Sequence, residues 1–196
     1  YMRSYSYYSQ HEMQQLFKDD ITKEYEWLSN QHRHIFNQCY KTDLVNQICH
    51  TDIHLFMQGL NLSYTDRASM AASVEVRVPF IDKEVIELAM KITGKLKYRH
   101  KQSKYILKKV AEDYLPPNII YRPKASFGAP IRSWISDDLK SLVDELLSES
   151  CIARRGIFNY KYIKQLIEND RNGVEDNAYR IYMLLTMELW FRQYID

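Results

Sequence analysis

Long stretches with a helical spacing of apolar residues, interrupted by few turn-forming residues, constrain the fold of this chain most. Residues 12–17, 21–35 and 42–56 place apolar side chains three and four positions apart between charged ones, as a helix with one buried face does. The 196 residues include only 5 glycines and 5 prolines, whereas a strand-rich domain needs many turns. We therefore expect a mainly α fold and a single helical domain over residues 1–196.

Local signals predict where several helices begin and end. Ser9 and Glu12 form a capping-box pattern, Asp82 is a candidate N-cap for a helix over residues 83–92, and Gly94 would stop that helix. Pro79 would end a helix over residues 70–76, and Gly59, Asn61 and Ser63 would break the pattern before it. Further helices are expected over residues 103–114, from 131 or 137 to 147, 160–167 and 177–194. The last is apolar nearly all round, so we expect it to be buried.

Composition excludes few functions. The formal charge of +2 gives no reason to expect nucleic acid or an acidic membrane as a partner, and no apolar run is long enough to span a bilayer. Cys39, Cys49 and Cys151 contain no CxxC pair, which favours reduced thiols in a cytoplasmic protein. The start lacks the order of a signal peptide. Position 1 is Tyr rather than Met, which suggests that the chain begins inside a longer one.

Four charges lie in an otherwise small and apolar segment over residues 66–82. Asp66, Arg67, Glu75 and Arg77 alternate with Ala, Met, Val and Phe, a composition that suggests burial. Buried charges are tolerated when they pair or hold a ligand. The segment is therefore either a structural ion-pair network or the wall of a polar site.

Two cationic segments are candidates for binding an anion. Lys101 and Lys104 lie where a helix is expected to begin, a place that favours phosphate, although a solvated basic helix start is the commoner meaning of this pattern. Arg122 and Lys124 lie in a loop restrained by Pro and Gly, which suits a fixed cation that stabilises developing negative charge. The alternative there is an ordinary surface turn.

Patterns typical of metal and nucleotide sites are weak or missing. His50 and His54 are four residues apart and could share a helix face, but no HExxH order is present and Asp52 lies off that face. We expect a surface pair there and no metal site. No G-x-G-x-x-G, G-x-x-x-x-G-K-[ST] or G-x-S-x-G motif occurs, so the familiar self-contained nucleotide cradles are absent from the sequence.

Three segments taken together resemble one family. They cover residues 66–82, residues 103–108 with 115–117, and residues 122–130 with Trp134 and Ile135. Their order and spacing are similar to the C-terminal part of the synthetase domain of glutamine-hydrolysing asparagine synthetases, strongly over residues 60–135 and weakly elsewhere. The resemblance implies the helical half of an α/β adenine-nucleotide α-hydrolase-like (ATP-pyrophosphatase) synthetase domain.

The resemblance also implies an activity and residue roles. The family uses ATP and Mg²⁺ to adenylate the aspartate side-chain carboxylate, releases pyrophosphate, and forms asparagine with ammonia from glutamine. Lys124 matches a loop lysine that steadies the transition states, and Lys104 matches a lysine near the phosphates. Asp66, Arg67, Glu75 and Arg77 match the polar segment that we expect to frame the site. Fixed cations suit a reaction that concentrates negative charge on phosphate.

Departures from the family limit the expectation. The family begins with a nucleophilic cysteine in a glutaminase domain and binds ATP with an S-G-G-x-D-S loop, whereas this chain starts with Tyr1 and contains no Gly-Gly pair. We therefore expect a fragment that is inactive alone, binds no cofactor alone, and works with upstream glutaminase and nucleotide-loop regions. An exposed apolar face would make it self-associate into a homo-oligomer. The alternatives are a β-lactam-forming or peptide-cyclising ligase, and a non-catalytic helical interaction module.

Overall fold

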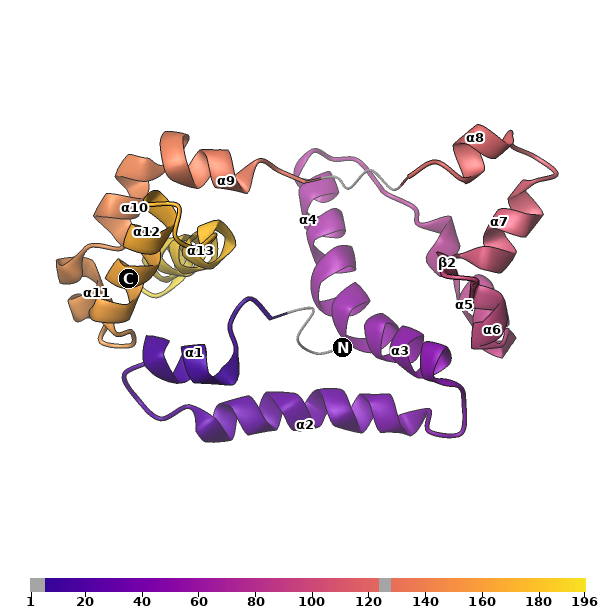
Figure 1. Cartoon of the computed structure of the whole chain (residues 1–196), viewed down its shortest axis with the longest axis horizontal. Helices are drawn as coiled ribbons and strands as arrows, with labels where there is room; N and C mark the ends of the chain where they lie inside the picture. The colour runs from indigo at the N-terminus through magenta and orange to yellow at the C-terminus, as the bar shows by residue number, and fades with distance from the viewer. Residues whose placement is uncertain (1–5, 124–127) are drawn as a thin grey trace. The chain divides into compact units, whose positions relative to one another are not determined.

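Two compact units make up the computed structural model, which describes residues 6–123 and 128–196 (Figure 1). Unit 1 contains Tyr1–Trp27 and Ser126–Asp196, and unit 2 contains Leu28–Ala125. Helices dominate the described part of both units, so the mainly helical fold class is confirmed. The single domain over residues 1–196 stays a prediction. Within the described ranges, no helix is long and apolar enough to cross a membrane.

Unit 1 is a cluster of helices around one apolar core. Its elements are α1 (Gln10–Leu16), the start of α2 (Thr22–Gln38), α9 (Ile131–Ser133), the π-helical η4 (Trp134–Asp138), α10 (Lys140–Leu146), α11 (Glu149–Arg155), α12 (Tyr160–Arg171) and α13 (Ala178–Tyr194). The fully buried side chains at its centre include Val143, Leu146, Ile152, Ile163 and Ile181. They come from α10 to α13, so these four helices build the core together.

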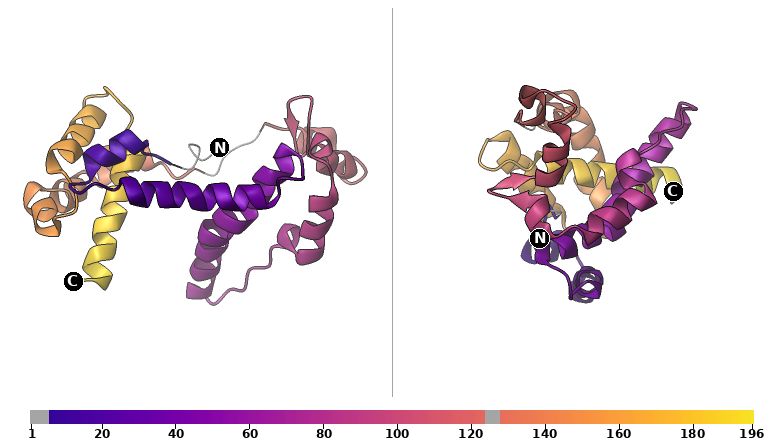
Figure 2. Two further views of the ribbon diagram at one scale, coloured as in Figure 1. Left: turned by 90° about the horizontal axis from the view of Figure 1, so that it is seen from below. Right: turned by 90° about the vertical axis from the view of Figure 1, so that its right-hand side faces the viewer.

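The long helix α13 is only half buried, so the prediction that it would be buried all round is wrong. Ala178, Ile181, Leu184 and Leu185 face the core, while Leu189 and other apolar residues of the later turns are exposed. The reason is geometric, because α9, α10 and α12 pack against one part of the helix. Figure 2 shows α13 (yellow) projecting beyond these helices.

The first helix begins as its capping box predicts. The N–H of Ser9 donates to Oε2 of Glu12 at 2.7 Å, and the N–H of Glu12 donates to Oγ of Ser9 at 3.3 Å. Oε1 of Glu12 also lies 2.6 Å from Nη2 of Arg180 in α13. The cap therefore fixes both the start of α1 and its place against α13.

Unit 2 contains the remaining helices and a short hairpin. Its elements are the rest of α2, α3 (Leu44–Asp52), the π-helical η2 (Ile53–Leu62), α4 (Ser63–Ala71), the 3₁₀ turn η3 (Pro79–Ile81), α5 (Lys83–Lys91), α6 (Gly94–Lys97), β1 (Tyr98–Arg99), β2 (Gln102–Ser103), α7 (Tyr105–Ala111) and α8 (Pro117–Ile120). The antiparallel strands pair Tyr98 with Ser103 and Arg99 with Gln102.

The helical backbone of unit 2 runs through the predicted break. Gly59 and Asn61 lie inside η2, and Ser63 begins α4 with ordinary right-handed angles. Gly59 takes no positive φ, so it does not turn the chain. The helix instead ends at Ala71, well before Pro79, which begins η3. The predicted break is therefore wrong, because the π-helical segment accommodates Gly59 and Asn61 without a turn.

A polar cluster joins the start of α3 to the start of α6. Asp43 caps α3 by accepting from the N–H of Asn46 at 3.1 Å, and its other oxygen accepts from the N–H of Gly94 at 2.8 Å. The buried Asn46 donates to the carbonyl of Ile92 at 3.1 Å and accepts from Nζ of Lys97. Asp82 caps α5 as predicted, but Gly94 begins α6 rather than only stopping α5.

Candidate functional site

The segment over residues 66–82 is exposed, and its predicted burial is wrong. Asp66 and Arg67 lie on the exposed face of α4. Arg77 Nη2 lies 2.6 Å from Glu75 Oε1, but the two side chains are 85% and 67% exposed. No described element covers them, so this ion pair contributes at most about 1 kcal/mol to stability. The role of the four residues as the polar frame of a site stays a prediction.

The apolar side chains of the same segment are also exposed. They are Met70, Val74, Val76, Val78 and Phe80, the last with 71% of its surface accessible. Scattered exposed apolar residues are common on proteins, but a contiguous run of them marks a surface that another element or partner covers. The composition of the segment predicted burial, and the described structure leaves its apolar side chains exposed.

Backbone strain is concentrated in the β1–β2 hairpin. The two-residue loop between the strands consists of His100 and Lys101, with φ of 52° and 61°, which is the pattern of a type I′ turn. Lys104 follows with φ of 57°. A left-handed backbone costs a residue with a side chain about 1–2 kcal/mol, and such strain gathers at functional sites. Helix α7 therefore begins at Tyr105 rather than at Ser103, with the strained Lys104 as its N-cap.

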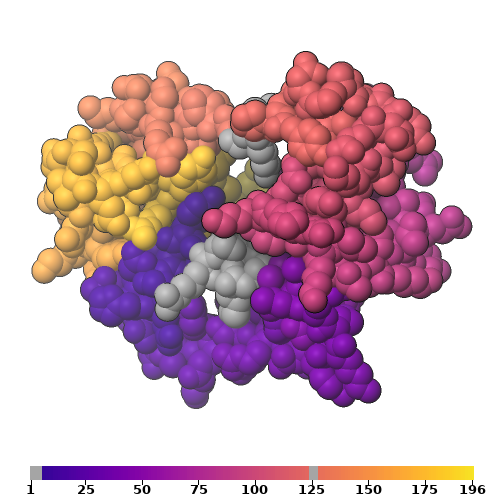
Figure 3. All heavy atoms as spheres, turned by 45° about the vertical axis from the view of Figure 1, so that its right-hand side comes forward, coloured from indigo at the N-terminus to yellow at the C-terminus, as the bar shows by residue number. Residues whose placement is uncertain are grey.

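Basic side chains gather along this hairpin and make a basic hairpin surface, which we define as Arg99, His100, Lys101 and Lys104. All four are exposed, and Figure 3 shows this part of the chain, coloured pink, at the surface. The guanidinium of Arg99 lies 5.4 Å from the centre of the Tyr105 ring. Among residues 6–123 and 128–196, neither Lys101 nor Lys104 has an ion-pair partner, and the predicted role of Lys104 at the phosphates stays a prediction.

A hydrogen-bonded group holds the chain just before the loop lysine. The hydroxyl of Tyr121 donates to Oε1 of Glu112, and Nζ of Lys109 lies 2.9 Å from the same oxygen. The Tyr121 hydroxyl and then Lys109 lower the pKa of the Glu112 carboxyl by hydrogen bonding to it. This group anchors the approach to Lys124, which itself lies outside the described residues. The predicted role of Lys124 stays a prediction.

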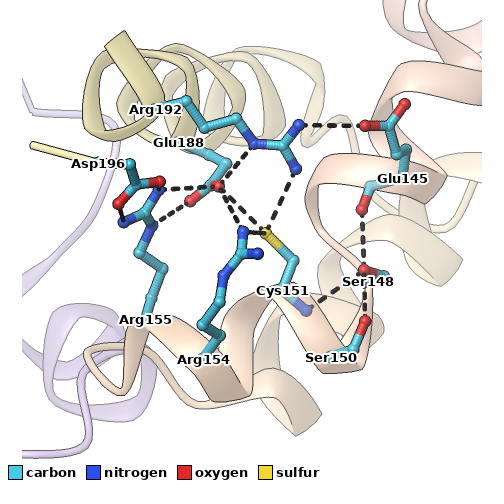
Figure 4. A network of polar contacts seen from close by, with 9 residues as sticks. All are labelled: Glu145, Ser148, Ser150, Cys151, Arg154, Arg155, Glu188, Arg192 and Asp196. Atoms are coloured by element: carbon cyan, nitrogen blue, oxygen red, sulfur yellow. Dashed lines mark hydrogen bonds and ion pairs between the residues drawn. The ribbon is translucent and has the colours of Figure 1, made fainter. Parts of the chain in front are cut away.

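The most extensive charge network lies in unit 1, where sequence reasoning placed no site (Figure 4). Glu188 is 4% exposed and accepts from Nε of Arg155 at 2.7 Å, from Nε of Arg192 at 3.0 Å and from the thiol of Cys151 at 3.1 Å. Arg155 also pairs with Asp196 at 2.6 Å. The network joins α11 to α13, and all its charges have partners. We therefore interpret it as a structural network that holds the two helices together.

The comparisons with known proteins identify the family. A sequence profile described as asparagine synthase matches residues 2–192. The chain belongs to the asparagine synthase family. It is 32% identical over 171 residues to asparagine synthetase (glutamine-hydrolyzing) 1 of Bacillus subtilis, covering 87% of this chain and 25% of that protein. The resemblance drawn from the three segments is thereby confirmed.

Two further relatives of this asparagine synthase family chain agree. A putative asparagine synthetase (glutamine-hydrolyzing) of Mycobacterium tuberculosis is 27% identical over 155 residues, covering 79% of this chain and 24% of that protein. Asparagine synthetase B (glutamine-hydrolyzing) of Escherichia coli is 37% identical over 87 residues, 43% of this chain and 16% of that protein. The chain spans about a quarter of the length of the first two relatives. No solved structure gives a significant match.

Proposed function

We propose that the chain supplies the helical part of an ATP-dependent ligase that forms asparagine. The ligase adenylates the side-chain carboxylate of aspartate and transfers to it ammonia released from glutamine. The observation that carries this proposal is the family match over residues 2–192. The chain is then one part of a longer protein and is inactive alone, with the glutaminase and nucleotide-loop regions as its partners.

The basic hairpin surface supports a role at the phosphates. Adenylation releases pyrophosphate, and fixed cations stabilise the charge that develops on it. Lys101 and Lys104 are exposed and without an ion-pair partner in the described structure, and both have a left-handed backbone, with φ of 61° and 57°. We assign Lys104 to the pyrophosphate and Lys124, from the following loop, to the transition states of adenylation and amide formation.

The described residues of this chain are suited to bind only the phosphate groups of ATP. The sequence has no Gly-Gly pair, and among residues 6–123 and 128–196 no group of three or more His, Cys, Asp or Glu side chains could hold a metal ion. We therefore place the nucleotide loop and the ligands of Mg²⁺ in the remainder of the longer protein. ATP with Mg²⁺ would supply the adenylyl group and release pyrophosphate, and this chain would supply cations near the released pyrophosphate.

Pyrophosphate release by the full-length protein tests the proposal. We expect release that depends on ATP and aspartate, and at least a hundredfold loss of turnover in Lys124→Ala, because removing one stabilising group of this kind costs about 10²–10³ in rate. Lys83→Ala, an exposed lysine on α5, is the matched control and should keep full turnover. A preference for another carboxylic acid would favour the β-lactam-forming or peptide-cyclising alternative. No release with any acid would favour the interaction module.

The exposed apolar residues suggest the state of the chain by itself. We propose that residues of the longer protein cover Met70, Val78 and Phe80, and that the 196-residue chain alone therefore self-associates. Light scattering of the isolated chain measures this directly. A monodisperse monomer over a tenfold range of concentration would contradict the proposal.

A further inference from the structure

Two histidines meet at the junction of α3 and η2, in a part of unit 2 that the proposed ligase reaction does not use. His50 lies in the last turn of α3, and His54 is the second residue of η2. Their ring centroids are 4.1 Å apart, with the ring planes tilted by 43°. His54 is exposed and His50 is partly exposed, so both rings are accessible from solvent.

Hydrogen bonds determine which nitrogen of each ring carries the proton. Nδ1 of His54 lies 2.8 Å from the carbonyl oxygen of His50, and a carbonyl can only accept, so this nitrogen donates. Nε2 of His50 lies 3.3 Å from Oε1 of Gln38, which also can only accept. A neutral imidazole has one N–H. Nε2 of His54 and Nδ1 of His50 therefore carry free lone pairs.

The amide of Gln38 is itself oriented by a third histidine. Its Nε2, which can only donate, lies 3.3 Å from Nε2 of His34 on the same helix. This contact turns Oε1 of Gln38 toward His50 and stabilises the tautomer in which His50 Nδ1 is unprotonated. Histidines that bind metals are held in the same way, with the second ring nitrogen donating to a carbonyl or amide oxygen.

We propose that His50 and His54 form a two-ligand site for a divalent transition-metal ion such as Zn²⁺, Ni²⁺ or Cu²⁺. Imidazole nitrogen suits these ions, and the two lone pairs are on adjacent turns of one continuous helical segment. Water completes the coordination, because no third candidate ligand accompanies the pair in the part of the chain that the structure describes. This departs from the expectation of no metal site, which rested on the missing HExxH order.

The bound ion would act on the junction between two helix types. His50 belongs to the α-helical turns and His54 to the π-helical ones, so a bridging ion ties the last turn of α3 to the first turn of η2. Since the unfolded chain does not hold the two rings together, metal binding stabilises the folded junction by RT ln(1 + L/Kd), where L is the free ion concentration.

Calorimetric titration of the full-length protein with Zn²⁺ tests the site. We expect a binding event that weakens by about tenfold or more in both His50→Gln and His54→Gln. His32→Gln is the matched control, because His32 Nδ1 donates to the carbonyl of Leu28 at 3.0 Å as His54 does to His50, but no histidine lies one turn away. Gln38→Leu, which removes the orienting contact, should weaken binding by about 10–100-fold.

A second measurement separates this pair from adventitious binding. The electron paramagnetic resonance spectrum of bound Cu²⁺ should show two nitrogen ligands in the wild-type protein and in His32→Gln, but one in His54→Gln. Circular dichroism confirms that each variant is folded. If His54→Gln keeps wild-type Zn²⁺ affinity, or if His32→Gln loses as much affinity as His54→Gln, the proposal is overturned. Aspartate-dependent pyrophosphate release is a separate readout, so failure of this site would leave the ligase proposal standing.

Discussion

The carboxylate of Asp43 accepts a 2.8 Å hydrogen bond from the backbone N–H of Gly94, 51 positions further along the chain. Because the same carboxylate caps α3, this single side chain sets the start of one helix and holds the start of another beside it. The close approach requires a residue without Cβ at position 94. A Cβ added there would lie 2.1 Å from Oδ1 of Asp43 and 2.7 Å from Cβ of Val45.

Gly94→Ala should therefore destabilise unit 2. We expect a loss of about 1–3 kcal/mol, because overpacking of this kind forces side chains and backbone apart. Gly59→Ala is the control, since a Cβ at Gly59 meets no atom within 4 Å and the residue lies within a helix, where Ala is preferred to Gly by about 1 kcal/mol. Hydrogen exchange of the α3 amides measures both effects. Equal protection in the two variants would refute the steric explanation.

The buried carboxylate of Glu188 should be essential for unit 1. Glu188→Gln leaves the guanidinium of Arg155, which is 9% exposed, without its buried partner, and breaking a buried pair costs about 3 kcal/mol or more. Glu145→Gln is the control. It removes a 3.1 Å contact to Arg192, another partner of Glu188, but Glu145 is 65% exposed. We therefore expect the free energy of unfolding to change by no more than about 0.5 kcal/mol. Thermal unfolding of the two variants measures the difference. Comparable losses would show that burial does not set the strength of this network.

Acid should weaken the same network. Burial by itself raises the pKa of the Glu188 carboxyl, but hydrogen bonds from Arg155, Cys151 and Arg192 outweigh it and hold that pKa below its ordinary value of 4.5. The unfolded state therefore binds the proton first as pH falls. The stability from Glu188 is complete above pH 4.5 and is lost as pH falls through the lowered folded pKa. Urea unfolding between pH 6 and pH 3 should decline less in Glu188→Gln, and parallel declines would contradict this assignment.

Strain in the basic hairpin surface should trade stability against anion binding. Lys101→Gly replaces a residue with φ of 61° by one that adopts this angle freely, so we expect a gain of about 1 kcal/mol together with weaker pyrophosphate binding by the full-length protein. Ser73→Gly, at φ of 56° and away from the hairpin, should give a similar gain with unchanged affinity. Calorimetric titration with pyrophosphate separates the two. If Lys101→Gly left the affinity for pyrophosphate unchanged, the explanation that the strain at Lys101 is kept for anion binding would be wrong.

Local sequence signals predicted helix starts better than helix ends. Ser9 and Asp82 were identified correctly because a cap depends only on residues two or three positions away. Gly59 and Asn61 predict a break, but a glycine or asparagine does not compel a turn, and the backbone continues through them as a π-helix. The burial of residues 66–82 was mispredicted because apolar composition favours burial, but it does not establish that any element of the described structure covers the segment.

The candidate site could be predicted from the sequence only in part, for similar reasons. The sequence predicts a helix start at Lys104 but not the hairpin that carries it, since His100 and Lys101 give none of the Asn or Gly signals that a type I′ turn normally shows. The Glu188 network could not be predicted from the sequence because Arg155 and Cys151 lie 33 and 37 positions from Glu188. Pairings over such distances are set by packing rather than by spacing.

The surroundings of Cys151 have a practical consequence for following motions of the protein. Its thiol is 5% exposed in unit 1, while Cys39 and Cys49 are partly exposed in unit 2, and all three are free. Burial raises the pKa of the Cys49 thiol, so a thiol reagent should modify Cys39 first and Cys49 next. Modification of Cys151 requires α11 and α13 to separate. The rate at which Cys151 is labelled therefore reports how often unit 1 opens transiently, and no cysteine has to be introduced to measure it.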